Sequence, residues 1–177
     1  MTIAFGLAPA LVLVAYVGLA VASVVLVVID LRSRRLPDMI VLPTFALLLV
    51  LFTAAALLTG DGGPVLRAVI GAAGLCACYL VVALLSRGGM GFGDVKLAAL
   101  LGLATAWAGW PAFVVGAASG FLLGGVYGLV LLALRRARRD SAVPFGPWML
   151  AGAWIGILAG GPVWSWYAAL AGLQVVA

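Results

Sequence analysis

Five long stretches of this sequence contain no charged residue. They cover residues 1–29, 39–60, 68–86, 97–134 and 141–177. A helix crosses the hydrocarbon core of a bilayer with about 20 apolar residues, so each of the first three stretches is long enough for one crossing. The chain is 67% hydrophobic and 8% charged, which leaves too little polar material to cover a soluble globule. The sequence therefore predicts an all-α membrane protein.

The last two stretches are longer than a single crossing needs. Pro111 divides residues 97–134, because a proline inside a helix removes a backbone hydrogen bond, and this predicts two helices joined by a tight turn. A sixth helix is expected after Pro144, and the Gly-Gly-Pro segment at 160–162 predicts a break within the last stretch. We expect a polytopic bundle of about six transmembrane helices in a single membrane-embedded domain, residues 1–177, with a seventh apolar C-terminal segment left open.

Glycines repeat every four residues along two of the expected helices. One row is Gly116, Gly120, Gly124 and Gly128, and the other is Gly152, Gly156 and Gly160. Residues four apart lie on one face of a helix, and small residues there let helix backbones approach closely. The rows predict tight helix packing, with a groove that admits a substrate helix as the alternative.

The basic residues are distributed unevenly between the loops. Nine of the ten Lys and Arg residues lie in three segments, 32–35, 87–96 and 135–139. Arg67 is the exception. The positive-inside rule places these three loops in the cytoplasm and the amino terminus outside, which puts Asp30 and Asp94 on the cytoplasmic side. The formal charge of +5 is accounted for by short loops beside anionic lipid, so we expect membrane lipid, and no nucleic acid, as the partner of the basic residues.

The missing residue types exclude most catalytic sets. The chain has no His and no Glu, so no Ser-His or Cys-His pair forms, and a zinc or two-metal hydrolase lacks its usual ligands. A Ser-Lys dyad would depend on Lys96, the single lysine, and no serine is close to it in sequence. Cys76 and Cys78 are two residues apart, so on a helix they point in different directions and are not expected to pair or bind metal. We predict no metal and no cofactor, which leaves chemistry by carboxyl groups.

Two of the five aspartates stand out by their position. Asp61 and Asp140 lie in loops, and Asp38 lies in the first turn of a helix, where the macrodipole favours an acid and predicts a capping role. Asp30 instead ends a run of 29 uncharged residues, and Asp94 follows a glycine-rich segment. An ionisable group at membrane depth is costly and usually functional. If these two carboxyl groups meet, they share a proton, and one polarises water while the other protonates a scissile carbonyl oxygen.

Three motifs around these aspartates resemble those of a known family. They are Asp-Leu-Arg-Ser-Arg-Arg-Leu-Pro-Asp at 30–38, Gly-Met-Gly-Phe-Gly-Asp-Val-Lys at 89–96 and Pro-Phe-Gly-Pro at 144–147. In order and spacing they resemble the prepilin peptidases, the type IV leader peptidase family of GxGD aspartyl proteases, which also includes the archaeal preflagellin peptidases. The resemblance implies that Asp30 and Asp94 are the catalytic pair.

The resemblance also implies which other residues form the site. The motif residues expected to bind substrate or shape the site are Gly91, Phe92, Gly93, Lys96, Pro144, Phe145, Gly146 and Pro147. Two roles stay open for Lys96, an interfacial anchor and a neighbour that favours the ionised state of the aspartates. For the arginines at 32–35, lipid anchoring is favoured over substrate contact.

The implied substrate is the amino terminus of a type IV pilin-like precursor, a short basic leader followed by an apolar helix, which is cut after a glycine at the cytoplasmic membrane face. The implied location is the cytoplasmic (inner) membrane of a prokaryote. Many bacterial members carry a further domain with paired cysteines that methylates the new amino terminus. This sequence begins with its first span and has no Cys-x-x-Cys pair, so we expect cleavage without methylation. The oligomeric state is left open.

Two alternatives use the same aspartates. Proteases similar to presenilin or signal peptide peptidase also use GxGD, but their first aspartate follows a tyrosine and their late motif is Pro-Ala-Leu, whereas Ile29 precedes Asp30 here. A small transporter or proton channel could use Asp30 and Asp94 as a relay. The spans show no evident inverted repeat, which favours the peptidase.

Overall fold

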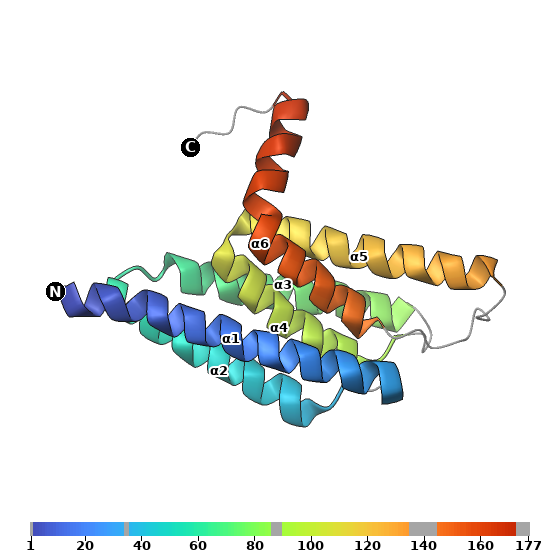
Figure 1. Ribbon diagram of the computed structural model, residues 1–177, viewed down its shortest axis with the longest axis horizontal. Helices are drawn as coiled ribbons and strands as arrows, with labels where there is room; N and C mark the ends of the chain where they lie inside the picture. Colours follow the sequence, from blue (N-terminus) through green and yellow to red (C-terminus); the bar gives the residue numbers. More distant parts are fainter. Residues whose placement is uncertain (1, 34–35, 86–89, 135–144, 173–177) are drawn as a thin grey trace.

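The computed structural model describes residues 2–33, 36–85, 90–134 and 145–172, and within them all regular structure is helical (Figure 1). The helices are α1 (Thr2–Ser33), α2 (Asp38–Thr59), α3 (Gly63–Leu85), α4 (Phe92–Ala108), α5 (Trp110–Ala133) and α6 (Gly146–Leu170). The uncharged stretches of the sequence thus become helices, since only helical backbone satisfies its own hydrogen bonds in lipid. The prediction of an all-α membrane bundle of about six helices is confirmed.

Glycine and proline set the boundaries between consecutive helices. Gly60 ends α2 with a φ of 74°, a left-handed conformation that glycine adopts without steric cost. Gly109 separates α4 from α5 with a φ of 143°. Pro111 follows as the second residue of α5, where a helix needs no N–H group from it. The tight turn predicted at this proline is confirmed.

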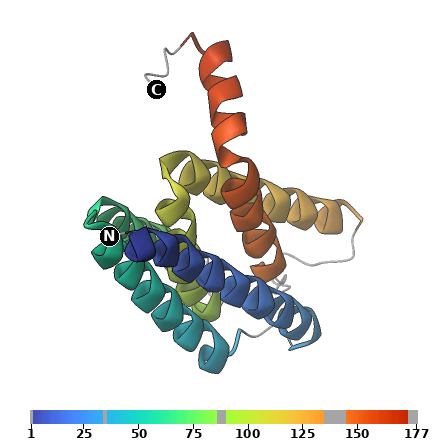
Figure 2. The same cartoon turned by 60° about the vertical axis from the view of Figure 1, so that its left-hand side comes forward.

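Four helical segments are long and apolar enough to cross a membrane. They are Gly6–Ser33, Asp38–Thr59, Gly63–Leu85 and Trp110–Leu131. The shorter α4 has 17 residues, a length of about 26 Å. It packs against α2, α3, α5 and α6, and its leucines at 97, 100 and 103 are fully buried. This central helix, between α1 and α2 on one side and α5 and α6 on the other, carries Asp94 (Figures 1 and 2).

Helix α6 continues through the Gly-Gly-Pro segment at which a break was predicted. Pro162 lies inside the helix and cannot donate a hydrogen bond to the carbonyl group four residues earlier. The helix accordingly changes direction, and its C-terminal part leaves the bundle (Figure 1). The predicted break is therefore wrong and is replaced by a bend, and the described residues contain no separate seventh helix.

The two rows of glycines hold α5 and α6 together. A Cβ atom added to Gly152 or Gly156 would overlap the backbone of α5 at Gly116 or Gly120. Gly128, in contrast, faces open space. The tight packing predicted from the rows is confirmed except at Gly128, and α6 itself fills the groove along α5.

Candidate active site

The end of α1, which carries Asp30, and the start of α4, which carries Asp94, lie at the same end of the helical bundle (Figure 1). Asp30 is in the last turn of α1, and Asp94 is the third residue of α4. Successive helices run in alternating directions, so the ends of α1, α3 and α5 meet the starts of α2, α4 and α6. The three basic segments of the sequence also connect helices at this end. Its assignment to the cytoplasm stays a prediction.

The Asp30 carboxyl group is buried beneath the first turn of α6. Only 4% of Asp30 is exposed. The backbone N–H of Gly146 interacts with this carboxyl group, and a Cβ atom on Gly146 would lie 2.7 Å from Oδ2. No described residue offers a hydrogen bond to Oδ2. A buried oxygen without a partner costs about 1–3 kcal/mol, so the site retains an unused acceptor that a water or substrate group can engage.

Asp94 is held by the start of its own helix. Gly91 is the N-cap of α4, and its backbone N–H interacts with the Asp94 carboxylate three residues later, as in a capping box. Asp94 lies outside the four segments of membrane-spanning length. Burial and the nearby negative charge of Asp30 together raise its pKa from 3.8 to about 6, and the Gly91 N–H opposes both effects. The charge of Asp30 therefore acts on the proton of the Asp94 carboxyl group.

Leu36, in the connection between α1 and α2, joins the parts of the site. A Cβ atom on Gly93 would lie 3.0 Å from the Leu36 Cβ, and one on Gly146 would lie 3.5 Å from its Cδ2. The side chain thus reaches both the GxGD segment and the start of α6. Glycine at 93 permits this close approach, because a side chain there would push α4 away from Leu36.

The chain matches a known protein family. Residues 8–129 match the sequence profile of the type IV leader peptidase family. The chain belongs to this family. The resemblance inferred from the three motifs is thereby confirmed.

Curated bacterial proteins of the same kind cover most of the chain. The prepilin leader peptidase/N-methyltransferase of Aeromonas salmonicida is 36% identical over 148 residues, which are 81% of this chain and 48% of the relative. The protein of that name from Aeromonas hydrophila is 35% identical over 169 residues, 93% of this chain and 56% of the relative. That of Pseudomonas aeruginosa is 33% identical over 147 residues, 82% of this chain and 49% of the relative. This leader peptidase family member thus spans about half the length of these relatives, and no solved structure gives a significant match.

The apolar helices and the bacterial relatives together make this leader peptidase family member a multi-pass membrane protein of a prokaryote. Its orientation and the identity of the membrane stay predictions.

Lys96 pairs with Asp38 in the structure. The Lys96 Nζ lies 2.5 Å from Asp38 Oδ2, and both side chains are about half exposed. Pro37 is the N-cap of α2 and makes no side-chain capping hydrogen bond, and Asp38 follows it in the first turn, the position where the macrodipole favours an acid. Through this ion pair, Asp38 also ties the start of α2 to the start of α4. Leu36 and Gly93 lie close to these two helix starts. The ion pair adds a contact to Asp38 that the sequence did not predict, and the two roles left open for Lys96 stay predictions.

The other motif residues take different positions around the aspartates. Phe92 is 66% exposed at the surface. Phe145 is the N-cap of α6, and its ring packs against those of Tyr79 and Phe121 at centroid distances of 6.1 Å. Pro147 lines a groove between α1 and α6. Pro144 lies outside the described residues, and the substrate-binding roles of the whole set stay predictions.

The far end of α4 is anchored by contacts that the sequence did not reveal. The Tyr16 hydroxyl donates to the Ala104 carbonyl oxygen at 3.0 Å. Arg67 donates from Nε to Ala106 O at 2.6 Å and from its terminal nitrogen to Trp107 O at 2.8 Å. A cation at the carboxyl end of a helix complements the macrodipole. This contact explains why Arg67 lies outside the three basic loops. That exception was the one signal of the contact in the sequence.

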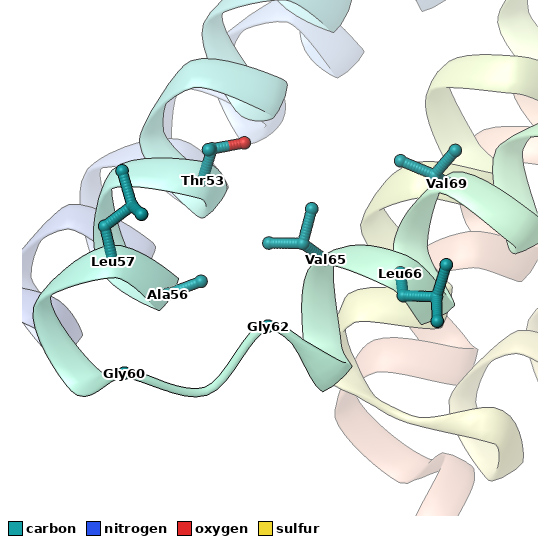
Figure 3. Close-up of a pocket in the computed structure, with 8 residues that line it drawn as sticks. All are labelled: Thr53, Ala56, Leu57, Gly60, Gly62, Val65, Leu66 and Val69. Atoms are coloured by element: carbon teal, nitrogen blue, oxygen red, sulfur yellow. The ribbon is translucent and has the colours of Figure 1, made fainter.

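A pocket also lies away from the two aspartates, so cavity volume alone does not identify the candidate active site. It has a volume of about 460 Å³ and lies between α2 and α3, at the end of the bundle opposite to Asp30. Figure 3 shows Thr53, Ala56 and Leu57 on one wall and Val65, Leu66 and Val69 on the other. Its lining contains no ionisable side chain, so it provides apolar surface without acid or base chemistry.

Replacing Asp30 with Asn is expected to lower the pKa of Asp94. The substitution removes the negative charge that contributes to the raised value of about 6, whereas burial of Asp94 remains. The pKa should therefore fall but stay above 3.8. The infrared absorption of the protonated carboxyl group, followed against pH in detergent, measures the change, and Asp94→Asn identifies the band. An unchanged midpoint in Asp30→Asn would show that the two groups are not coupled.

Proposed function

We propose that this protein is a membrane aspartyl endopeptidase that removes the basic leader from type IV prepilin-like precursors. The observation that carries the proposal is the position of Asp30 and Asp94 at one end of the bundle, where the charge of Asp30 helps to raise the pKa of Asp94. Membership of the leader peptidase family supports the same activity. The proposed activity needs no group beyond two carboxyls and water.

The two aspartates share one proton in the proposed mechanism. The ionised carboxylate takes a proton from water, which attacks the scissile carbonyl carbon, while the protonated carboxyl group donates to the carbonyl oxygen. The tetrahedral intermediate then loses the amine, which takes a proton from the carboxyl group that acted as base, while one hydroxyl of the intermediate returns a proton to the carboxylate that acted as acid. The products are a leader with a new carboxylate and a mature chain with a new amino terminus.

The aspartate end of the bundle is proposed to face the cytoplasm of the cell, at its inner membrane. The basic segments at 32–35, 87–96 and 135–139 all connect helices at this end, as the positive-inside rule requires of cytoplasmic loops. A relay across the membrane finds less support. The buried residues of α4, from Val95 to Ala106, are apolar apart from Thr105, and a relay needs ionisable groups along the path.

Cleavage is proposed to occur without methyl transfer by residues 1–177. The two cysteines, Cys76 and Cys78, lie within α3 and do not form a Cys-x-x-Cys pair.

The test is to express residues 1–177 with a type IV prepilin in a host that lacks its own leader peptidase. Gel mobility reports leader loss, and mass spectrometry of the product reports the cleavage position and any methyl group on the new amino terminus. We expect a product cut after a glycine and carrying no methyl group. A precursor that stays full length beside folded protein overturns the peptidase assignment, whereas a methylated product overturns only the second part.

A further inference from the structure

An apolar groove runs between α1 and α6 beside the candidate active site. Its volume is about 430 Å³. The residues that line it are Ala20, Ser23, Val24, Val27, Val28, Pro147, Leu150, Ala151 and Trp154. Along α1 it extends over the nine residues from Ala20 to Val28, a rise of about 12 Å or just over two helical turns. Val24 is 66% exposed, so the groove opens to the lipid side of the bundle.

The few polar groups in this groove are already paired. The buried Ser23 hydroxyl donates to the Leu19 carbonyl oxygen at 2.7 Å and accepts from Trp154 Nε1 at 3.2 Å. What remains available to an occupant is therefore apolar surface. Ala20 and Ala151 have short side chains, and small residues of this kind allow a second helix to approach closely.

One end of the groove reaches Asp30. Val27 lies three residues before Asp30 on α1, so the two share a helix face. Pro147 follows Gly146, whose backbone lies against the Asp30 carboxyl group. The pocket between α2 and α3 and the one between α5 and α6 are lined by neither α1 nor α4, the helices that carry the two aspartates.

The two sides of α6 are held differently. On the α5 side, the glycine rows bring the helix backbones into direct contact. On the α1 side, the contacts are Gly146 against Asp30 and Trp154 to Ser23, and the groove lies between them. Asp30 is 4% exposed, and the described backbone that lies against its carboxyl group is Gly146, so the seam between α1 and α6 leads to it. A helix in the groove lies at that seam.

We propose that the groove between α1 and α6 binds the apolar helix of the substrate and so delivers the peptide bond at its cytoplasmic end to Asp30. This inference rests on the proposed function, because the occupant is the apolar segment that follows the leader of a prepilin. The groove supplies substrate affinity, and the aspartates supply the chemistry.

The test is cysteine cross-linking to a precursor whose apolar helix carries one cysteine, moved through four successive positions. The protein carries Asp94→Asn to slow turnover, and Cys76→Ala and Cys78→Ser to remove its free thiols. Val24→Cys lies in the groove, and Val21→Cys is the matched control, since Val21 is 62% exposed on the same helix but outside the groove. We expect a disulfide with Val24→Cys and its loss with Val21→Cys.

A second measurement fills the groove in the active protein. Ala151→Trp should raise KM for the precursor by at least about tenfold, or 1.4 kcal/mol of binding, and leave kcat unchanged. Leu57→Trp, in the pocket between α2 and α3, is the control. Equal cross-linking at both α1 positions, or an unchanged KM in Ala151→Trp, overturns the proposal that the groove binds the substrate helix. Either result is expected if lipid occupies the groove. Failure of the wild type to cleave this precursor instead overturns the proposed function.

Discussion

Asp30→Asn and Asp94→Asn are each expected to reduce leader cleavage by about 10²–10⁴-fold, the contribution of a positioned acid or base. Asparagine keeps the size of aspartate but cannot exchange the shared proton, so one substitution removes the water-activating base and the other removes the acid. The double variant should lose little more than either single variant, because the two groups act on one proton. Initial rates of leader release from a purified precursor measure all three.

The matched control for these variants is Asp61→Asn. Asp61 is exposed at the opposite end of the bundle, where its Oδ1 accepts a hydrogen bond from the Gly63 N–H at 2.9 Å. Asparagine retains that acceptor, so cleavage should stay at the wild-type rate. Thermal unfolding of each variant in detergent separates lost chemistry from lost structure. Near wild-type cleavage by either Asp30→Asn or Asp94→Asn would rule out the two-carboxyl mechanism.

The membrane helices and the common end of the two aspartates could be predicted because each depends on a local or a one-dimensional signal. Uncharged stretches follow directly from the cost of placing charge in lipid. The turn before α5 follows from Pro111, and the common end of Asp30 and Asp94 follows from counting crossings between them. None of these inferences needs to know which helices are neighbours.

The contacts around the site and along α4 could not be predicted, because they depend on which helices are neighbours. Lys96 meets Asp38 across 58 residues of sequence, and Arg67 reaches the Ala106 carbonyl group across 39. Leu36 is an ordinary apolar residue in the sequence, and its place between Gly93 and Gly146 appears only when α1, α4 and α6 are packed.

The bend in α6 was missed for a related reason. A Gly-Gly-Pro segment ends most helices in water, because the freed backbone groups are solvated there. In a membrane, the surrounding backbone is driven to keep its internal hydrogen bonds, so a helix tolerates such a segment by bending. Pro162 therefore changes the direction of α6 without ending it.

Gly146→Ala is expected to reduce cleavage by about 10–10²-fold, because displacing a catalytic group by 1 Å has an effect of that size. The new Cβ atom would lie 2.7 Å from Asp30 Oδ2, closer than the two atoms can approach, so the carboxyl group must move. Gly146 does not adopt a positive φ, and the backbone of α6 accepts alanine there. The fold should persist, and the loss should appear in kcat.

Gly125→Ala is the matched control for this substitution. A Cβ atom at Gly125 meets nothing within 4 Å, so the variant adds the same methyl group to a helix without touching the site. Alanine also favours helix over glycine by up to about 1 kcal/mol in both variants, so neither should unfold more easily on that account. Equal kcat values for the two variants would mean that the approach of Gly146 to Asp30 does not position the carboxyl group. A selective loss in Gly146→Ala would give the start of α6 a role in holding Asp30 at the distance that catalysis requires.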